Sequence, residues 1–412
     1  MRVLLMYGDG TQAIPVIKSL HKAGYVVDAV AESKYGYGSN SRYLDKRYFF
    51  EDVEDVDKYF NFLEGILKKE KYDAIIPMRD ENTKLLCKYR EQLLKYTRFV
   101  VPDDETFERG FDKHQLMEVC QKHGYPHPQT LIVQGGSLEG LDVEVLRYPV
   151  LIKPNHTAGG RGMTLVQNKE ELQEKFPAIY EQYGECHLQT YIPQGGAQVE
   201  VQLYVDKNKL LVNSSVIYKY RWFPENGGSS CCAKSVKNEK IVDILYHLLL
   251  DIGWVGFADF DTIEDPRTGE LLIMELNPRY PACVKAVFEA GIDWAEIVVN
   301  GYLGLPQKQY DYKEGEFLRH LGFETLWFFY SKNRWKTKPN WFKLFGKHIH
   351  YQDMSDWTDL IPFIKGTWGN VKKQMSPEFR ESKSGTRNKD KNMIINPQMT
   401  DNQNFRGGNP SC

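Results

Sequence analysis

Side chains with oxygen donors are grouped on two segments whose patterns predict neighbouring strands. Asp259 and Asp261 alternate with apolar residues, which places both carboxylates on one face of the first strand. Glu275 and Asn277 alternate in the same way on the second strand. A hairpin through 264–270 would bring the two polar faces together, so that Asp261, Glu275 and Asn277 converge. Hard oxygen ligands of this type suit Mg²⁺ or Mn²⁺, with substrate phosphates completing the coordination shell.

A solvated polar face of a hairpin would show the same alternation, so the residues that follow decide between the two interpretations. Asn277 is followed by Pro278 and Arg279, a rigid turn that carries a guanidinium group beside the carboxylates. Guanidinium groups bind anionic oxygens through paired N–H donors. We therefore predict a metal site at Asp261, Glu275 and Asn277, with Arg279 beside it.

A lysine and a glycine-rich loop indicate where phosphates would bind. Lys153 ends an apolar run, where its charge costs desolvation energy unless an anion pairs with it. In the loop that follows, Gly159, Gly160 and Gly162 allow the backbone to approach phosphates closely, and Arg161 adds charge. Taken singly, the lysine could equally be a snorkelling edge residue and the glycines a hairpin turn. Their succession favours a phosphate-binding surface.

The composition bounds the class of protein. With 412 residues and a formal net charge of −2, the chain is long enough for two or three domains and is not a general nucleic-acid binder. No apolar run approaches the length of a membrane span, and the N-terminus lacks a signal-peptide pattern. The seven cysteines contain no C-x-x-C pair, which is typical of a reduced, cytoplasmic protein without structural zinc. We interpret Cys283 as a packing thiol rather than a nucleophile.

Residues 1–110 alternate strand and helix patterns, which predicts a parallel sheet wrapped by helices. Gly8-Asp9-Gly10 completes only half of a dinucleotide-binding fingerprint, because Ala13 stands at the third glycine position. We therefore do not predict a nicotinamide site there. The predicted strands cover 3–7, 25–30, 74–77 and 99–101, and the predicted helices cover 11–23, 56–69 and 81–95.

The pattern changes at Phe111. Asp112 caps a predicted helix over 113–123, which Gly124 ends. The strands that follow alternate polar and apolar residues and predict an antiparallel sheet with helices, an α+β arrangement. These strands are expected at 148–153, 163–166, 187–191, 198–205, 210–218, 256–262 and 271–275, with a helix over 238–252.

Taken in order, the motifs resemble the ATP-grasp superfamily. They are FDKHQLMEVCQKHGYPHPQT, then YPVLIKP with HTAGGRGM, then LQTYIPQGGAQVEVQLYVD, and finally GFADFD with MELNPRY. The resemblance covers about 1–305 and implies a mixed α/β and α+β protein. Its expected parts are a parallel-sheet pre-ATP-grasp domain over 1–110, a two-lobed ATP-grasp domain over 111–305 (lid subdomain about 111–186, C-terminal lobe about 187–305), an aromatic and basic C-terminal extension over 306–375, and a disordered tail over 376–412.

The resemblance also implies roles for single residues. Lys113 and Lys153 would contact ATP phosphates, and Arg279 would act with Lys153 in catalysis by stabilising the transferring phosphoryl group. Arg221 and the loop 227–230 would line the acyl-phosphate site. The other expected ligands are Gly159, Gly160, Arg161 and Gly162 in the lid, Gln189, Thr190, Tyr191 and Ile192 in the adenine hinge, Glu200 at the ribose, and Asp261, Glu275 and Asn277 at one or two Mg²⁺ ions. Gln189 departs from the acidic residue of many relatives.

The implied reaction joins a carboxylate to an amine through an acyl phosphate, at the expense of ATP. The motifs resemble carbamoyl-phosphate-synthase-like and D-aspartate-ligase-like enzymes, so amino-acid, peptide or cell-envelope precursors are the expected substrates. Two alternatives remain open: a non-catalytic nucleotide-binding or regulatory protein, and a component of a carbamoyl-phosphate-type synthase. The expected partners are ATP and small carboxylate and amine substrates, with room for a homo-oligomer and no nucleic acid.

Residues 317–347 combine aromatic and basic side chains. Six basic residues and no acidic one lie between Lys332 and Lys347. Such a segment suits contact with an anionic membrane surface, which would make a cytoplasmic protein membrane-associated. A helical cap that packs its aromatic residues on the ligase body would have the same composition, and both interpretations remain open.

Overall fold

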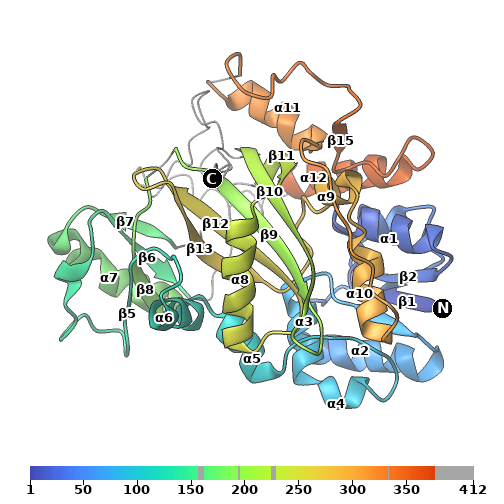
Figure 1. Ribbon diagram of the computed structural model, residues 1–412, viewed down its shortest axis with the longest axis horizontal. Coiled ribbons are helices and arrows are strands. Elements are labelled where there is room, and N and C mark those ends of the chain that lie inside the picture. Colours follow the sequence, from blue (N-terminus) through green and yellow to red (C-terminus); the bar gives the residue numbers. More distant parts are fainter. Residues whose placement is uncertain (156–161, 194, 224–228, 333, 376–412) are drawn as a thin grey trace, which may run out of the picture.

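The computed structural model describes residues 1–155, 162–193, 195–223, 229–332 and 334–375. It contains a four-stranded N-terminal sheet, a second four-stranded sheet and a seven-stranded sheet. The seven-stranded sheet lies between the other two (Figure 1). Among the described residues, no helix is long and apolar enough to cross a lipid bilayer.

The N-terminal sheet is parallel, in the order β3-β2-β1-β4, as its strand–helix alternation predicts. The predicted strand over 99–101 is wrong, because Arg98 makes only an isolated bridge to Ala74 there. The elements are β1 (Arg2–Leu5), α1 (Ala13–Lys22), β2 (Val26–Ala31), the 3₁₀ turn η1 (Gly38–Asn40), β3 (Lys46–Phe49), α2 (Val56–Lys69), β4 (Ala74–Ile76), α3 (Asp80–Lys88) and α4 (Arg90–Leu93).

The second four-stranded sheet is antiparallel, in the order β5-β8-β6-β7, and has its own hydrophobic core. The helix before it begins as predicted, because the Asp112 side chain accepts from the Gln115 N–H at 2.9 Å. Gly124 ends that helix at a φ of 75°. The elements are α5 (Asp104–Phe111), α6 (Lys113–His123), β5 (Thr130–Ile132), the 3₁₀ turn η2 (Val143–Val145), β6 (Val150–Pro154), β7 (Thr164–Val166), α7 (Lys169–Tyr183) and β8 (Cys186–Thr190).

The seven-stranded sheet has the order β13-β12-β9-β10-β11-β14-β15. It shares one continuous hydrophobic core with the N-terminal sheet. The prediction missed β11 and ended β10 too early. The elements are β9 (Gln198–Val205), β10 (Leu211–Phe223), β11 (Ser229–Val236), α8 (Glu239–Ile252), β12 (Gly256–Asp265), β13 (Glu270–Asn277), α9 (Lys285–Ala290) and α10 (Trp294–Leu303).

The segment predicted as a C-terminal extension returns to both neighbouring parts of the molecule. β14 pairs with β11, and β15 pairs with β14, so the segment lengthens the large sheet. The last helix, α12, packs on η1 of the N-terminal domain. The elements are β14 (Phe317–Arg319), α11 (Leu321–Tyr330), β15 (Ile349–Tyr351) and α12 (Ile361–Met375). The domain boundaries drawn from the sequence stay a prediction.

Candidate active site

Three carboxylates stand side by side across strands β9, β12 and β13. Asp261 on β12 lies opposite Glu200 of β9 on one side and Glu275 of β13 on the other. The predicted hairpin therefore forms, with Gly269 in its turn at a φ of 73°. Like charges on neighbouring strands destabilise a sheet unless cations lie beside them. This row of carboxylates, Glu200, Asp261 and Glu275, is called the acidic row below.

Lys219 on β10 is the cation that pairs with two members of the acidic row. Its Nζ lies 2.5 Å from Glu200 Oε1 and 2.8 Å from Asp261 Oδ1. Burial opposes its charge, but the two carboxylates overcome this effect and raise the pKa of Lys219 well above its ordinary value. Sequence reasoning missed this residue. The signal was present, because a lysine in a largely buried strand is the same feature that singled out Lys153.

Asp259 shares the strand face of Asp261 but lies deeper in the protein. Its Oδ1 accepts from Gln202 Nε2 at 2.7 Å. Burial, followed by repulsion from Glu200 and Asp261, raises the pKa of Asp259 well above its ordinary value. Asp261 behaves oppositely: burial raises its pKa, but Lys219 outweighs burial and keeps the pKa below the ordinary value. Asp261 is therefore the ionised member of the pair.

The turn after β13 connects the acidic row to the N-terminal domain. Asn277 Nδ2 donates to Asp261 Oδ2 at 3.2 Å, and Arg279 Nη2 donates to Asn277 Oδ1 at 3.4 Å. Arg279 Nε also lies 2.8 Å from Asp80 Oδ1 at the start of α3. Burial opposes the guanidinium charge, but Asp80 and then the acidic residues of β12 raise the pKa of Arg279. The predicted Arg279 therefore stands beside the predicted metal ligands.

The three predicted metal ligands come together. Asp261 contacts Asn277, as described, and lies opposite Glu275 on the neighbouring strand. Glu275 Oε2 also lies 3.2 Å from Lys113 Nζ at the start of α6. Within the described ranges, no group of three or more His, Cys, Asp and Glu side chains is arranged to hold a metal ion. Lysine ammonium groups pair with the carboxylates instead. The donor set, two carboxylates and one amide, fits Mg²⁺ by its chemistry.

Lys153 is a buried ammonium group at the end of β6. It is 6% exposed, and its Nζ donates to Gln189 Oε1 at 2.9 Å. The Gln189 amide nitrogen donates to Thr130 Oγ1 at 3.1 Å, which holds the amide oxygen toward the lysine. Burial, together with repulsion from Lys113, lowers the pKa of Lys153 to about 8. A buried cation with a neutral partner and a cationic neighbour favours an incoming anion.

The predicted adenine hinge leaves the small sheet at the end of β8. The Thr190 N–H donates to the Gln129 carbonyl at 2.8 Å, and the Tyr191 N–H donates to the Pro149 carbonyl at 2.9 Å. Ile192, the next residue, is buried. These bonds tie the hinge to the segments on both sides of it. Its contact with adenine stays a prediction.

Glu200 was expected to hold the ribose. Its Oε1 pairs with Lys219, and its Oε2 accepts from the Cys283 thiol. Burial, followed by the charge of Glu200, raises the pKa of Cys283 well above its ordinary value. A thiol held protonated is a poor nucleophile, so the geometry agrees with the packing role predicted for Cys283. The ribose contact of Glu200 stays a prediction.

Comparison with known proteins gives this geometry a family. A model described as "ATP-grasp domain" matches residues 111–283, which hold every member of the acidic row and both phosphate-side lysines. The chain contains an ATP-grasp domain. Its resemblance to D-aspartate ligase of Enterococcus faecium reaches 27% identity over 323 residues, which cover 72% of this chain and 75% of that enzyme.

Other relatives and solved structures agree with this assignment. The N-terminal section of the carbamoyl phosphate synthase large chain of Aquifex aeolicus is 25% identical over 66% of this chain, which spans about half (49%) of that relative. The biotin carboxylase domain of the Hydrogenobacter thermophilus 2-oxoglutarate carboxylase, solved with MgADP, superimposes with a TM-score of 0.62 at 20% identity, covering 77% of this chain and 73% of that one. The L-amino acid ligase of Bacillus licheniformis superimposes with a TM-score of 0.58 at 15% identity, covering 77% and 78%. These comparisons confirm the predicted ATP-grasp fold, and the relatives that they name are ligases, a synthase and a biotin carboxylase.

Most of the ATP-grasp lid prediction falls outside the described residues. Gly159, Gly160 and Arg161 lie there, as do residues 227 and 228 of the second predicted loop. Gly162 is described and has a φ of 75°, and a Cβ at this position would lie 2.8 Å from the Tyr183 ring. A glycine is therefore required at this position, just before β7.

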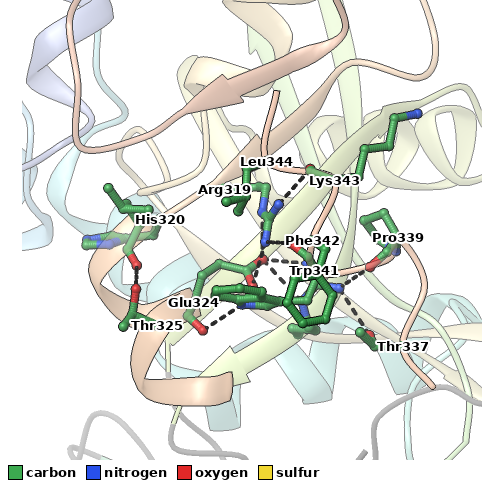
Figure 2. A network of polar contacts seen from close by, with 12 residues as sticks. Arg319, His320, Glu324, Thr325, Thr337, Pro339, Trp341, Phe342, Lys343 and Leu344 are labelled. Atoms are coloured by element: carbon green, nitrogen blue, oxygen red, sulfur yellow. Dashed lines mark hydrogen bonds and ion pairs between the residues drawn. The ribbon is translucent and has the colours of Figure 1, made fainter. Parts of the chain in front are cut away.

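Arg221 does not line the acyl-phosphate site, so that prediction is wrong. The side chain is fully buried, and its Nη2 lies 2.5 Å from Glu324 Oε1 on α11. Register shifts on both sides of Arg221 interrupt the β10–β11 pairing and re-aim its side chain away from the face of Lys219. Arg319 of β14 approaches the same Glu324 carboxylate at 3.2 Å (Figure 2). Arg221, Arg319 and Glu324 form the buried ion cluster.

Proposed function

We propose that the ATP-grasp domain activates a small carboxylate as an acyl phosphate and joins it to an amine. The observation that carries this proposal is the acidic row, in which Lys219 pairs with two carboxylates and Lys113 with the third, and Arg279 lies beside it. Such a site offers carboxylates for a divalent cation and cations for phosphate oxygens within one surface. It contains what phosphoryl transfer requires, which is positioning and charge stabilisation.

The reaction proceeds in two displacements. In the first, a carboxylate oxygen of the substrate attacks the γ-phosphorus, the bond to the β–γ bridging oxygen breaks, and ADP leaves. In the second, the amine nitrogen attacks the acyl carbon, the carbon–oxygen bond to phosphate breaks, and phosphate leaves as the nitrogen loses its proton to the solvent. The first step supplies the leaving group that a free carboxylate lacks.

The residues divide this work by their charge. Lys113 and Lys153 would hold phosphate oxygens, and Lys219, which pairs with Asp261, is a third ammonium group beside the site. Arg279 offers its remaining N–H groups to the transferring phosphoryl group and to the tetrahedral intermediate. Asp261, Glu275 and Asn277 would hold the Mg²⁺ or Mn²⁺ ion, which would supply positive charge to offset that of the phosphates. The sugar and base lie along Glu200 and the hinge 189–192.

The substrate carboxylate, which accepts the phosphoryl group, lies between the acidic row and the N-terminal domain. Arg279 is held by Asp80, and Thr83 Oγ1 donates to the Pro278 carbonyl at 2.7 Å, so α3 contacts the turn that carries Arg279. The loop 77–80 before α3 therefore borders the space next to the phosphoryl group. Because D-aspartate ligase is among the relatives, we place small amino acids first among the candidate carboxylates.

Phosphate release from MgATP tests this proposal with D-aspartate, L-aspartate, other small amino acids and bicarbonate, each with and without an amine panel. Hydroxylamine in place of the amine should trap the acyl phosphate as a hydroxamate. Carboxylate-dependent phosphate release together with hydroxamate formation supports the proposal. Firm nucleotide binding without turnover for any pair would favour the non-catalytic alternative. Carbamate or carbamoyl phosphate as the product with bicarbonate would favour the carbamoyl-phosphate-type alternative.

We also propose that residues 317–347 contact an anionic membrane surface. Phe329, Trp335 and Phe345 are 67%, 70% and 74% exposed, among basic side chains with no acidic residue between Lys332 and Lys347. Exposed aromatic and basic side chains together suit the interface of an anionic bilayer. The paired substitutions Trp335→Ser and Phe345→Ser should reduce co-sedimentation with phosphatidylglycerol vesicles. Unchanged pelleting would contradict this contact.

A further inference from the structure

Exposed apolar side chains are concentrated in the C-terminal part of the chain. Of the eighteen exposed large hydrophobic residues in the described part of the protein, twelve lie between Phe329 and Met375. A protein surface normally scatters such residues singly. Five of the twelve belong to α12, outside the segment 317–347: Ile361, Ile364, Trp368, Val371 and Met375. Their exposure is unexplained by the ligase reaction.

The five residues form one stripe along α12. At 100° per residue they fall within an arc of about 80° on the helix. Their side chains are between 42% and 63% exposed, so the stripe faces away from the protein along its whole length. We call these five residues the α12 stripe. A helix of 15 residues is about 22 Å long, so the stripe is a continuous apolar strip.

The opposite face of α12 explains why the large side chains are left outside. A Cβ at Gly366 would lie 2.3 Å from the Tyr37 ring, and a Cβ at Gly369 would lie 2.8 Å from the backbone of Tyr35. Asn370 Nδ2 donates to the Tyr37 hydroxyl at 2.9 Å. Small residues thus bring the helix close to the N-terminal domain. The helix is anchored by its glycines, and its apolar stripe has no partner within the described residues.

The charges beside the stripe indicate the partner. Lys365 and Lys372 lie along one edge of it, and residues 360–375 contain no acidic side chain. Lys365 Nζ donates to Asn40 and Lys372 Nζ donates to the Tyr35 hydroxyl, both neutral groups. Their positive charges are therefore not neutralised by these contacts. An apolar strip with lysines along one edge and no acidic side chain is the composition of a helix that lies in the plane of an anionic bilayer.

Segment 317–347, which includes α11, lies at the same end of the molecule as α12. Tyr37, which packs on α12, also makes an edge contact at 6.3 Å with His320, the N-cap of α11. Figure 1 shows α11, β15 and α12 gathered at this end. The buried ion cluster holds the aromatic segment in place, because Arg319 donates to the carbonyls of Trp341 and Lys343 at 3.0 and 2.8 Å (Figure 2).

We propose that α12 is an interfacial helix that inserts its apolar stripe into the headgroup region of an anionic lipid surface, beside segment 317–347. This inference rests on the membrane contact proposed for that segment and extends it to a second, amphipathic element. The occupant is a lipid surface rather than a second copy of the chain, because the lysines beside the stripe would repel their own copies across a two-fold contact. The bound orientation would turn the end of the molecule that carries α11 and α12 toward the bilayer.

Vesicle co-sedimentation of the full chain tests this proposal, with vesicles of phosphatidylcholine alone or mixed with phosphatidylglycerol, at low and high salt. The stripe variant carries Ile364→Ser, Trp368→Ser and Val371→Ser. The matched control carries Val26→Ser, Val145→Ser and Leu210→Ser, which are exposed apolar residues elsewhere. We expect the wild type and the control to bind anionic vesicles in a salt-sensitive way, and the stripe variant to lose about tenfold or more in partitioning.

Each outcome decides between the two contacts. Loss of binding in the stripe variant but not in the Trp335→Ser/Phe345→Ser variant supports α12 alone and removes the contact proposed for segment 317–347. The reverse result overturns the α12 proposal and leaves that contact standing. Light scattering measures the mass of each protein in solution. If the stripe variant has a lower mass than the wild type but binds lipid equally well, the occupant of the stripe is a second copy of the chain, and this result also overturns the proposal. Wild-type thermal unfolding and nucleotide binding in the stripe variant confirm that it folds.

Discussion

At the level of single residues, Lys219 has a central role in the charge balance of the candidate site. It neutralises two of the three carboxylates of the acidic row, and the third is paired with Lys113. Removing one partner of a buried ion pair strongly destabilises the folded protein, because the other charge is left unpaired. The same lysine therefore serves two purposes: it allows the carboxylates to stand side by side, and it lies where phosphate oxygens must arrive if Asp261 holds the cation.

Removing the Lys219 ammonium should impair both purposes. We expect Lys219→Met to lower kcat by about 100-fold or more, because the proposed site loses one charge that would stabilise the transferring phosphoryl group. Phosphate release and nucleotide binding, measured side by side, check this expectation. Lys207→Met, at an exposed lysine, is the matched control. If Lys219→Met turns over within about twofold of the wild-type rate, Lys219 has no role in phosphoryl transfer.

The pKa of Lys153, about 8, predicts a pH dependence. In the proposed site the ammonium form of Lys153 binds phosphate, so ATP affinity of the free protein should fall as the pH rises through about 8. Stability should move in the opposite direction: because the folded pKa lies below the ordinary value, the unfolded chain binds more protons above pH 8, and this group's contribution to stability rises with pH. A titration of ATP affinity against pH should show the fall in the wild type and not in Lys153→Met. An identical profile in both proteins would assign the dependence to another group.

Helix α11 is linked to two strands of the large sheet by ion pairs of its Glu324 side chain. Glu324 is 1% exposed and faces Arg221 of β10 and Arg319 of β14. Two guanidinium groups and one carboxylate leave a net positive charge in a buried place. Backbone carbonyls share it, since Arg221 donates to Pro339 and Arg319 to Trp341. These hydrogen bonds hold residues 337–343 against the large sheet.

Breaking this cluster should cost stability without touching the chemistry. We expect Glu324→Gln to lower the free energy of unfolding by about 3 kcal/mol, because two buried guanidinium groups lose their carboxylate. Denaturant unfolding of the variant beside Glu314→Gln, an exposed neighbour, measures the difference. ATP affinity should stay at the wild-type value. A loss of ATP affinity larger than the loss of stability would show that the cluster reaches the active site.

At the scale of the whole molecule, the site lies where separate parts of the chain meet. Lys153 belongs to the small sheet, the acidic row to the large sheet, and Asp80 to the N-terminal domain. A ligand that contacts all three should bind only the assembled protein and should therefore stabilise it.

Divalent cation and nucleotide together should raise the thermal midpoint. At a hundredfold excess over the dissociation constant, MgADP should add about 2.7 kcal/mol to the stability. EDTA should remove both this increment and all turnover. Glu275→Gln should require more Mg²⁺ for turnover and for the stability gain, because one oxygen ligand has lost its charge. Wild-type Mg²⁺ dependence in this variant would exclude Glu275 as a ligand. Thermal unfolding and phosphate release over a Mg²⁺ series measure both effects.

Local patterns were enough for much of the fold and for most of the candidate ligands. The period-2 alternation of β12 and β13 placed Asp261, Glu275 and Asn277 on one face, and a hairpin turn does the rest. The helix cap at Asp112 and the stop at Gly124 depend on neighbouring residues alone. The parallel N-terminal sheet followed from strand–helix alternation, which has few solutions.

Contacts between distant residues decided what alternation could not. Nothing near Lys219 in the chain says that Glu200 and Asp261 will flank it, since that follows from the order β12-β9-β10 in the sheet. Arg221, two residues further on, has the same charge and the same strand, yet register shifts beside it turn it into a buried cluster with Glu324, 103 residues away. The sequence analysis did not single out α12, and only its packing through Gly366 and Gly369 shows that its apolar stripe faces outward. Side-chain type and period are local properties, whereas the partner of a charge is set by which strands the folded chain brings together.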